Sequence, residues 1–99
     1  MPYRRGSDWS DKTELACLTI FKKLEEKDFP RGLQIDLCRE LSKKTKLSVG
    51  SISAKVCNYK SVAGVNSESN ASHNTISIYQ QYGHLSSGEI EKAMNKLPT

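Results

Sequence analysis

Residues 33–60 of this 99-residue chain, LQIDLCRELSKKTKLSVGSISAKVCNYK, decide its predicted fold. Leu33, Leu37 and Leu41 recur every four residues, which is typical of one apolar face of a helix over residues 33–44. The lysines at the end of this segment complement the negative end of the helix dipole. The first half of the stretch is therefore predicted to be a helix with a buried leucine face.

A second helix is predicted after a link of three residues, TKL. Ser48 is a favourable N-cap, and the helix is expected to run to about Lys60. Ile52, Val56 and Tyr59 lie at i, i+4 and i+7, so they share one face that we expect to be buried. The opposite face is expected to be polar, basic and formed by small residues, and it comprises Gly50, Ser51, Ala54, Lys55 and Asn58. Two helices joined by so short a link predict a helix-turn-helix.

A helix before this pair is expected to begin near Asp11. Asp11 and Glu14 have the spacing of a capping box, with aspartate as the capping residue. The proline-containing loop that starts at Phe29 should end this helix. Its core-facing stripe is expected to comprise Leu15, Leu18, Phe21 (or Ile20) and Leu24.

Two more segments follow a polar loop at residues 61–72. Residues 73–82 are predicted to be helical, although their β-branched content and mixed periodicity leave a strand as the alternative. Ser86 and Glu89 have capping-box spacing and mark the start of a last helix, which Pro98 ends.

These elements predict an all-α fold with a tri-helical helix-turn-helix core plus two C-terminal helices. Residues 1–7 are expected to form a flexible basic arm. Residues 8–99 are expected to form a single helical domain of the kind that binds DNA.

The net positive charge of the chain is concentrated in residues 39–60. This segment carries six basic residues and one acid, whereas residues 1–38 are neutral overall and residues 61–99 carry a net charge of −1. A polyanion-binding surface needs such a field, because each neutralised phosphate releases counterions. The alternative is that these lysines are only solvated side chains on helix faces.

We expect the second helix of the pair to enter the major groove of duplex DNA with its N-terminal half. The side chains predicted to face base edges are Ser48, Ser51, Lys55 and Asn58. The lysines predicted to contact phosphates, which position a protein without specifying sequence, are Lys43, Lys44, Lys46 and Lys60. Arg4 and Arg5 of the arm are predicted to lie in a narrow minor groove.

Two alternatives stay open for this helix. Gly50 and Ala54 could serve tight helix packing, and Asn58 could cap the loop that follows. The DNA-binding interpretation requires Lys44, Lys46, Lys55 and Lys60 to lie on one continuous face with the exposed side of the second helix.

Two stretches resemble known families. WSDKTEL at residues 9–15 resembles the opening of a Myb/SANT-type tri-helical domain. LSVGSISAKVCNYKSV at residues 47–62, followed by SNAS at residues 69–72, is similar to the N-terminal domain of bacterial HNH-endonuclease-type proteins, which is thought to bind DNA. The resemblance implies DNA binding by the 48–60 helix, with Lys55 and Asn58 as the matching polar positions.

No enzyme activity, cofactor or metal site is expected. No nuclease motif follows within the 99 residues, and His73 and His84 do not make an HNH metal site. Cys17, Cys38 and Cys57 lack the paired spacing of zinc ligands, so we interpret them as buried or half-buried thiols in a reducing compartment. No apolar run approaches the length of about 20 residues that spans a bilayer, so a cytoplasmic location, nucleoid-associated in a bacterium, is expected.

The predicted partner is double-stranded DNA, bound by a small regulator or by a recognition module whose effector protein is another chain. A homodimer is a further arrangement that the sequence permits. The alternative function is a protein–protein interaction module of SANT-like fold, whose basic groove receives an acidic peptide. That function predicts a contiguous apolar patch around Tyr79, Tyr82 and the last helix. RNA binding is a third interpretation with less support from the sequence, because it needs exposed aromatic residues for stacking.

Overall fold

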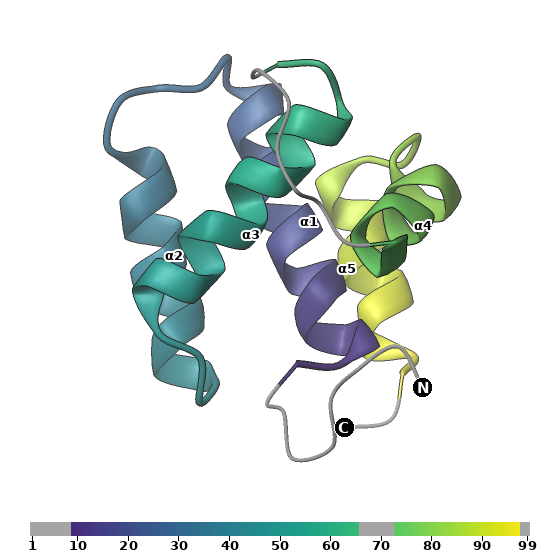
Figure 1. Cartoon of the computed structure of the whole chain (residues 1–99), viewed down its shortest axis with the longest axis horizontal. Helices are drawn as coiled ribbons and strands as arrows, with labels where there is room; N and C mark the ends of the chain where they lie inside the picture. The colour runs from purple at the N-terminus through teal and green to yellow at the C-terminus, as the bar shows by residue number, and fades with distance from the viewer. Residues whose placement is uncertain (1–8, 66–72, 98–99) are drawn as a thin grey trace.

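A computed structural model describes residues 9–65 and 73–97, which form five helices and contain no strand (Figure 1). Their bounds are Asp11–Glu26 (α1), Leu33–Lys44 (α2), Val49–Val62 (α3), His73–Tyr82 (α4) and Ser87–Asn95 (α5). The all-helical class is confirmed. The strand alternative for α4 is wrong, because Thr75 and Ile78 are buried one helical turn apart. The basic arm predicted at residues 1–7 lies outside the described residues.

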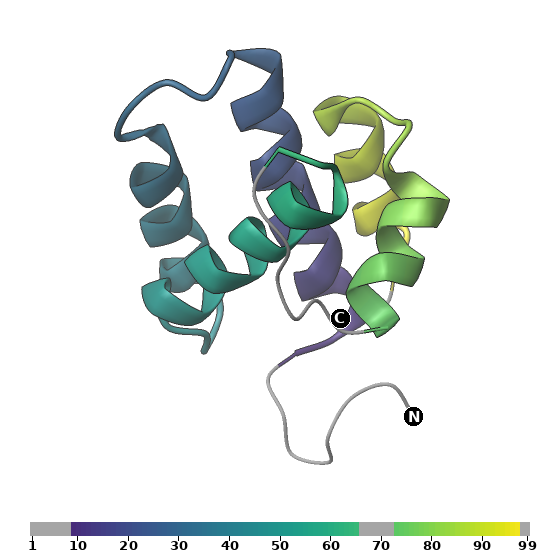
Figure 2. The same cartoon turned by 45° about the horizontal axis from the view of Figure 1, so that its top comes forward.

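Helix α1 is the centre of the fold. The other four helices pack against it, with α2 on one side and α4 and α5 on the other (Figures 1 and 2). A helix surrounded in this way must be apolar on most of its circumference. The buried residues of α1 accordingly include Leu15, Cys17, Leu18, Ile20, Phe21 and Leu24.

The predicted core face of α3 is confirmed. Ile52, Val56 and Tyr59 are fully buried. Helix α2 lies at the edge of the fold, so its leucines pack against the core while staying half-exposed, and Cys38 is its one fully buried side chain among the described residues.

The described helices are also too short or too polar for any of them to cross a bilayer.

Two of the three predicted helix caps are confirmed. Ser48 accepts a hydrogen bond from the amide of Ser51, and Ser86 forms a capping box with Glu89. The cap predicted at Asp11 is wrong. Ser10, whose backbone is extended, caps α1 instead and forms a box with Thr13, whose Oγ1 accepts from the Ser10 amide at 2.7 Å. Glu14 is therefore not needed at the cap, and its side chain turns into the protein.

The turn between α4 and α5 is held tightly against α1. The Gly83 amide donates to the carbonyl oxygen of Tyr79 at 2.7 Å, and Lys22 Nζ donates to the carbonyl oxygen of Gly83 at 2.8 Å. A Cβ atom at position 83 would lie 2.5 Å from that Tyr79 oxygen and 3.0 Å from the Tyr79 ring. The ring packs edge-on against Phe21. Only glycine fits this turn without a backbone shift.

Two glycine substitutions should have opposite effects. We expect Gly83→Ala to destabilise the protein by about 1–3 kcal/mol, because the added methyl group overpacks the turn. Gly88→Ala should stabilise it by about 0.5–1 kcal/mol, because position 88 lies in α5 with open space around it, and alanine favours the helix. Urea denaturation measures both. Equal effects at the two positions would contradict this account of the turn.

A carboxylate at the end of α1 anchors the start of α5. Glu26 accepts hydrogen bonds from the amide of Ser87 at 2.9 Å and from its hydroxyl at 2.8 Å. The backbone hydrogen bond, followed by the hydroxyl one, holds the pKa of Glu26 below its usual value. These bonds favour the charged form, so the contact is strongest with the carboxylate ionised.

Acidification should therefore weaken the contact between α1 and α5. Because the pKa of Glu26 is lower in the folded protein than in the unfolded chain, its stabilisation is present above about pH 4.3 and is lost as pH falls through the folded value. We expect Glu26→Gln to flatten the stability profile between about pH 5 and pH 3. Chemical denaturation across this range measures the slope. An unchanged slope in the variant would show that Glu26 contributes nothing to it.

Candidate nucleic-acid interface

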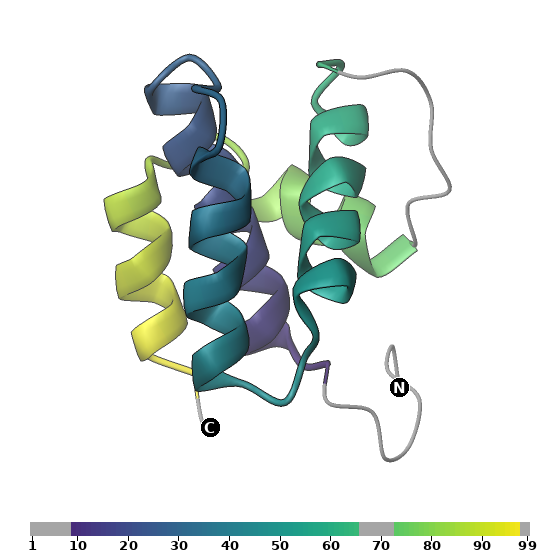
Figure 3. The ribbon, with the colours of Figure 1, turned by 90° about the vertical axis from the view of Figure 1, so that its left-hand side faces the viewer.

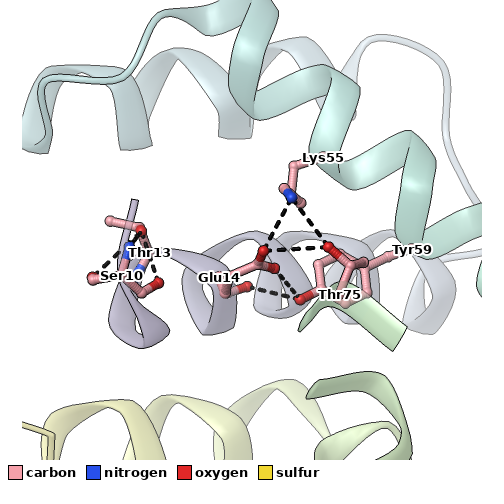
Figure 4. Close-up of polar contacts among 6 residues, drawn as sticks. All are labelled: Ser10, Thr13, Glu14, Lys55, Tyr59 and Thr75. Carbon is pink, nitrogen blue, oxygen red and sulfur yellow. Dashed lines mark hydrogen bonds and ion pairs between the residues drawn. The ribbon is translucent and has the colours of Figure 1, made fainter. Parts of the chain in front are cut away.

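Lys55 of α3, the basic residue predicted at the centre of the DNA interface, points into the protein. Its Nζ lies 3.0 Å from Oε1 of Glu14 on α1 and 3.1 Å from Oγ1 of Thr75 on α4 (Figure 4). The Glu14 side chain is 2% exposed and that of Lys55 is 16% exposed. The ion pair is therefore an internal contact between α1 and α3, and the hydrogen bond to Thr75 adds α4.

Both carboxylate oxygens of Glu14 also accept hydrogen bonds. Tyr59 of α3 donates its hydroxyl to Oε2 of Glu14, and Thr75 donates to Oε1 at 3.2 Å. The Nζ of Lys55 also lies 4.9 Å from the centre of the Trp9 ring, within the range of a cation–π contact. We call Glu14, Lys55, Tyr59 and Thr75 the buried network. It satisfies a carboxylate that would be costly to bury alone.

The Lys60 side chain lies on the side of α3 that faces α2, away from Lys55. Its Nζ donates to Oε1 of Gln34 on α2 and lies 5.7 Å from the centre of the Phe29 ring. The expectation that Lys44, Lys46, Lys55 and Lys60 share one continuous face is therefore wrong. Lys55 contacts the buried Glu14, whereas Lys60 contacts Gln34 of α2 and the Phe29 ring.

A smaller exposed cluster remains where α2 meets α3. Lys43 and Lys44 end α2, and Lys46 lies in the link. All three are exposed, and within residues 9–65 and 73–97 none of them forms an ion pair. The first turn of α3 beside them exposes Ser48, Gly50 and Ser51. We call these six residues the basic corner.

The hydroxyl groups of the basic corner are organised by the helix cap. Ser48 Oγ accepts from the Ser51 amide at 3.1 Å and donates to Ser51 Oγ at 3.0 Å. Gly50 adds no side chain, and a Cβ atom there would meet only Ser48 Oγ, at 4.0 Å. The backbone of this turn is consequently open to a close approach by a ligand.

The other predicted contacts lie elsewhere. Asn58 is half-buried on α3 and has interactions within the protein. Arg4 and Arg5 lie outside the described residues, so their role stays a prediction.

The predicted burial of the cysteines is confirmed. Cys17 and Cys38 are buried, and Cys57 is half-buried. Burial, followed by the nearby charge of Glu14, raises the pKa of Cys17, and burial likewise raises that of Cys38. A raised pKa keeps these thiols protonated, the form that is a poor nucleophile. In the described part of the chain, no three histidine, cysteine or acidic residues are grouped to hold a metal ion.

Comparisons with protein-family models, with curated proteins and with solved structures found no match to this chain. The resemblance to Myb/SANT-type and HNH-endonuclease-associated domains consequently rests on the two sequence stretches alone.

Because Lys55 belongs to the buried network, its substitution should lower the free energy of unfolding. We expect Lys55→Met to destabilise the protein by about 3–5 kcal/mol, because it leaves the Glu14 charge buried without a cation. Adding Glu14→Gln should recover a large part of this loss, because the amide oxygen still accepts from Tyr59 without carrying charge. Urea denaturation of the single and double variants gives the coupling energy.

Lys43→Met is the matched control, because it removes the same charge from the exposed end of α2. It should change the free energy of unfolding by less than about 0.5 kcal/mol. A Lys55→Met protein as stable as this control would contradict the structural role of the ion pair.

Proposed function

We propose that this chain binds duplex DNA through the basic corner. The observation that carries the proposal is that three lysines within four residues, Lys43, Lys44 and Lys46, are exposed at the end of α2 and in the link, directly before the open first turn of α3. Cationic side chains next to a helix N-terminus, where the helix dipole is positive, suit phosphate oxygens.

The arrangement of α2 and α3 is consistent with a helix-turn-helix. In such motifs the first helix crosses the DNA backbone and the second presents its N-terminal residues to the major groove. Here the lysines at the end of α2 and in the link would contact phosphates. Ser48 and Ser51 would face the base edges, and Gly50 would let the backbone approach the duplex. The resemblance of residues 47–62 to DNA-binding domains supports the same assignment.

The buried network limits what this interface can read. Glu14 neutralises Lys55 internally, so the recognition helix keeps short hydroxyl side chains and no long cation at its exposed N-terminal half. Phosphate contacts then supply most of the affinity, and they are independent of sequence. We infer a binder with weak sequence preference, acting as a small regulator or as the recognition module of an effector on another chain.

Binding should depend steeply on salt. If Lys43, Lys44 and Lys46 each neutralise one phosphate, affinity for a random duplex should fall about 40-fold between about 50 and about 200 mM salt. Lys43→Gln/Lys46→Gln should weaken binding at low salt and reduce that fall to about threefold. Fluorescence anisotropy with a labelled duplex measures both quantities.

Lys27→Gln/Arg31→Gln is the matched control, because it removes two exposed cations from the opposite end of α2. It should leave the salt dependence close to that of the unaltered protein. No binding to duplex at low salt would contradict the proposal. Equal weakening by the two double variants would show that net charge acts without a defined site.

A further inference from the structure

A groove runs along α1 between α2 and α5. It consists of a cavity of about 480 Å³ and an adjoining one of about 160 Å³, which share Ala16, Leu41, Lys44 and Met94 in their linings. Figure 3 faces this side of the molecule, where α2 and α5 run alongside α1. The lining runs along α1 from its N-cap Ser10 to Lys23, a length of about 20 Å at 1.5 Å per residue.

The floor of the groove is apolar. It is formed by Ala16, Ile20, Leu37, Leu41 and Met94. All of these except Ile20 are half-exposed, so the core leaves apolar surface uncovered along the groove. This is the contiguous apolar surface that a protein-binding function requires, and it lies away from Tyr79 and Tyr82, which pack against the core.

The charges along the groove differ between its two ends. The larger cavity is bordered by Lys12, Lys44 and Lys46 without an acidic residue in its lining. The smaller cavity is bordered by two lysines and two acids, Lys23, Lys44, Glu40 and Glu91, and Lys23 Nζ pairs with Glu91 at 2.9 Å. A ligand in the groove would therefore meet a cationic end and a nearly neutral end.

We propose that the groove binds an amphipathic helix of a partner protein, with acidic residues in the first turn of that helix. Acidic side chains are favourable at a helix N-terminus, and here they would also face the three lysines of the larger cavity. The partner helix would then run parallel to α1, with its apolar face on the floor. This is the helix-in-groove mode of recognition.

The spacing of the two cavities fits a helical ligand. Along α1, the middle of the larger lining and the middle of the smaller lining are about seven residues apart, or about 10 Å. Two turns of a partner helix span nearly the same distance, so large apolar side chains at i and i+7 would enter the two cavities. The proposal does not depend on DNA binding, because the floor residues belong to neither the basic corner nor α3.

Synthetic helical peptides of about fifteen residues test the proposal with the full chain. One peptide carries leucines at i, i+4 and i+7 and three glutamates in its first turn. A second places lysines in that turn, and a third moves the glutamates to its last turn. We expect the first to bind at least tenfold more tightly than the others by fluorescence anisotropy. Amide chemical-shift changes should lie along the groove lining.

Ala16→Trp should fill the floor that the two cavities share and weaken binding of the first peptide at least tenfold. Ala54→Trp is the matched control, because Ala54 is an exposed alanine on α3. Circular dichroism checks that both variants fold. Ala16→Trp should keep the duplex affinity of the unaltered protein. The measurement therefore distinguishes failure of the groove proposal from failure of the DNA-binding proposal.

Three results would overturn the proposal. The first is that none of the peptides binds, or that all three bind equally. The second is that Ala16→Trp and Ala54→Trp have the same effect on peptide affinity. The third is that dodecanoate binds in the groove while the peptides do not, which would make a small amphiphile the occupant.

Discussion

The ion pair between Glu14 and Lys55 is the interaction on which the arrangement of α1, α3 and α4 depends. A carboxylate that is 2% exposed is tolerated only if a cation and hydrogen-bond donors surround it. Lys55, Tyr59 and Thr75 supply these from two other helices. Hydrophobic burial is non-directional, whereas a displaced α3 would leave the Glu14 carboxylate buried without its cation. The polar contact therefore specifies one register for helices that hydrophobic burial holds together.

The same contact decides which part of the surface is available for a polyanion. The sequence concentrates positive charge on α2 and α3, but the fold draws Lys55 and Lys60 to opposite sides of α3. The exposed positive charge that remains lies at the end of α2 and in the link, next to the open first turn of α3 at Gly50. A surface of this kind favours contacts with a phosphate backbone over contacts with bases, which is why we propose binding with weak sequence preference.

Local signals in the sequence predicted the helices well, because spacing and capping are local properties. The apolar face of α3 and the caps at Ser48 and Ser86 needed no knowledge of other segments. The role of Glu14 could not be predicted in this way, since its partners are 41 to 61 residues distant. One signal was present: Lys55 follows Ile52 by three residues and precedes Tyr59 by four, which places it beside the buried face. The groove depends on where α5 packs, which local patterns do not encode.

Lys44 and Lys46 belong to two surfaces at once, the basic corner and the cationic end of the groove. A phosphate and a carboxylate cannot both neutralise the same ammonium group, so occupancy of one surface reduces the charge offered to the other. Binding free energies are reciprocal: a partner helix that lowered the affinity for DNA would have its own affinity lowered by DNA by the same factor. Two neighbouring lysines would thus make this small domain a switch between an acidic protein and a nucleic acid, without any change in its shape.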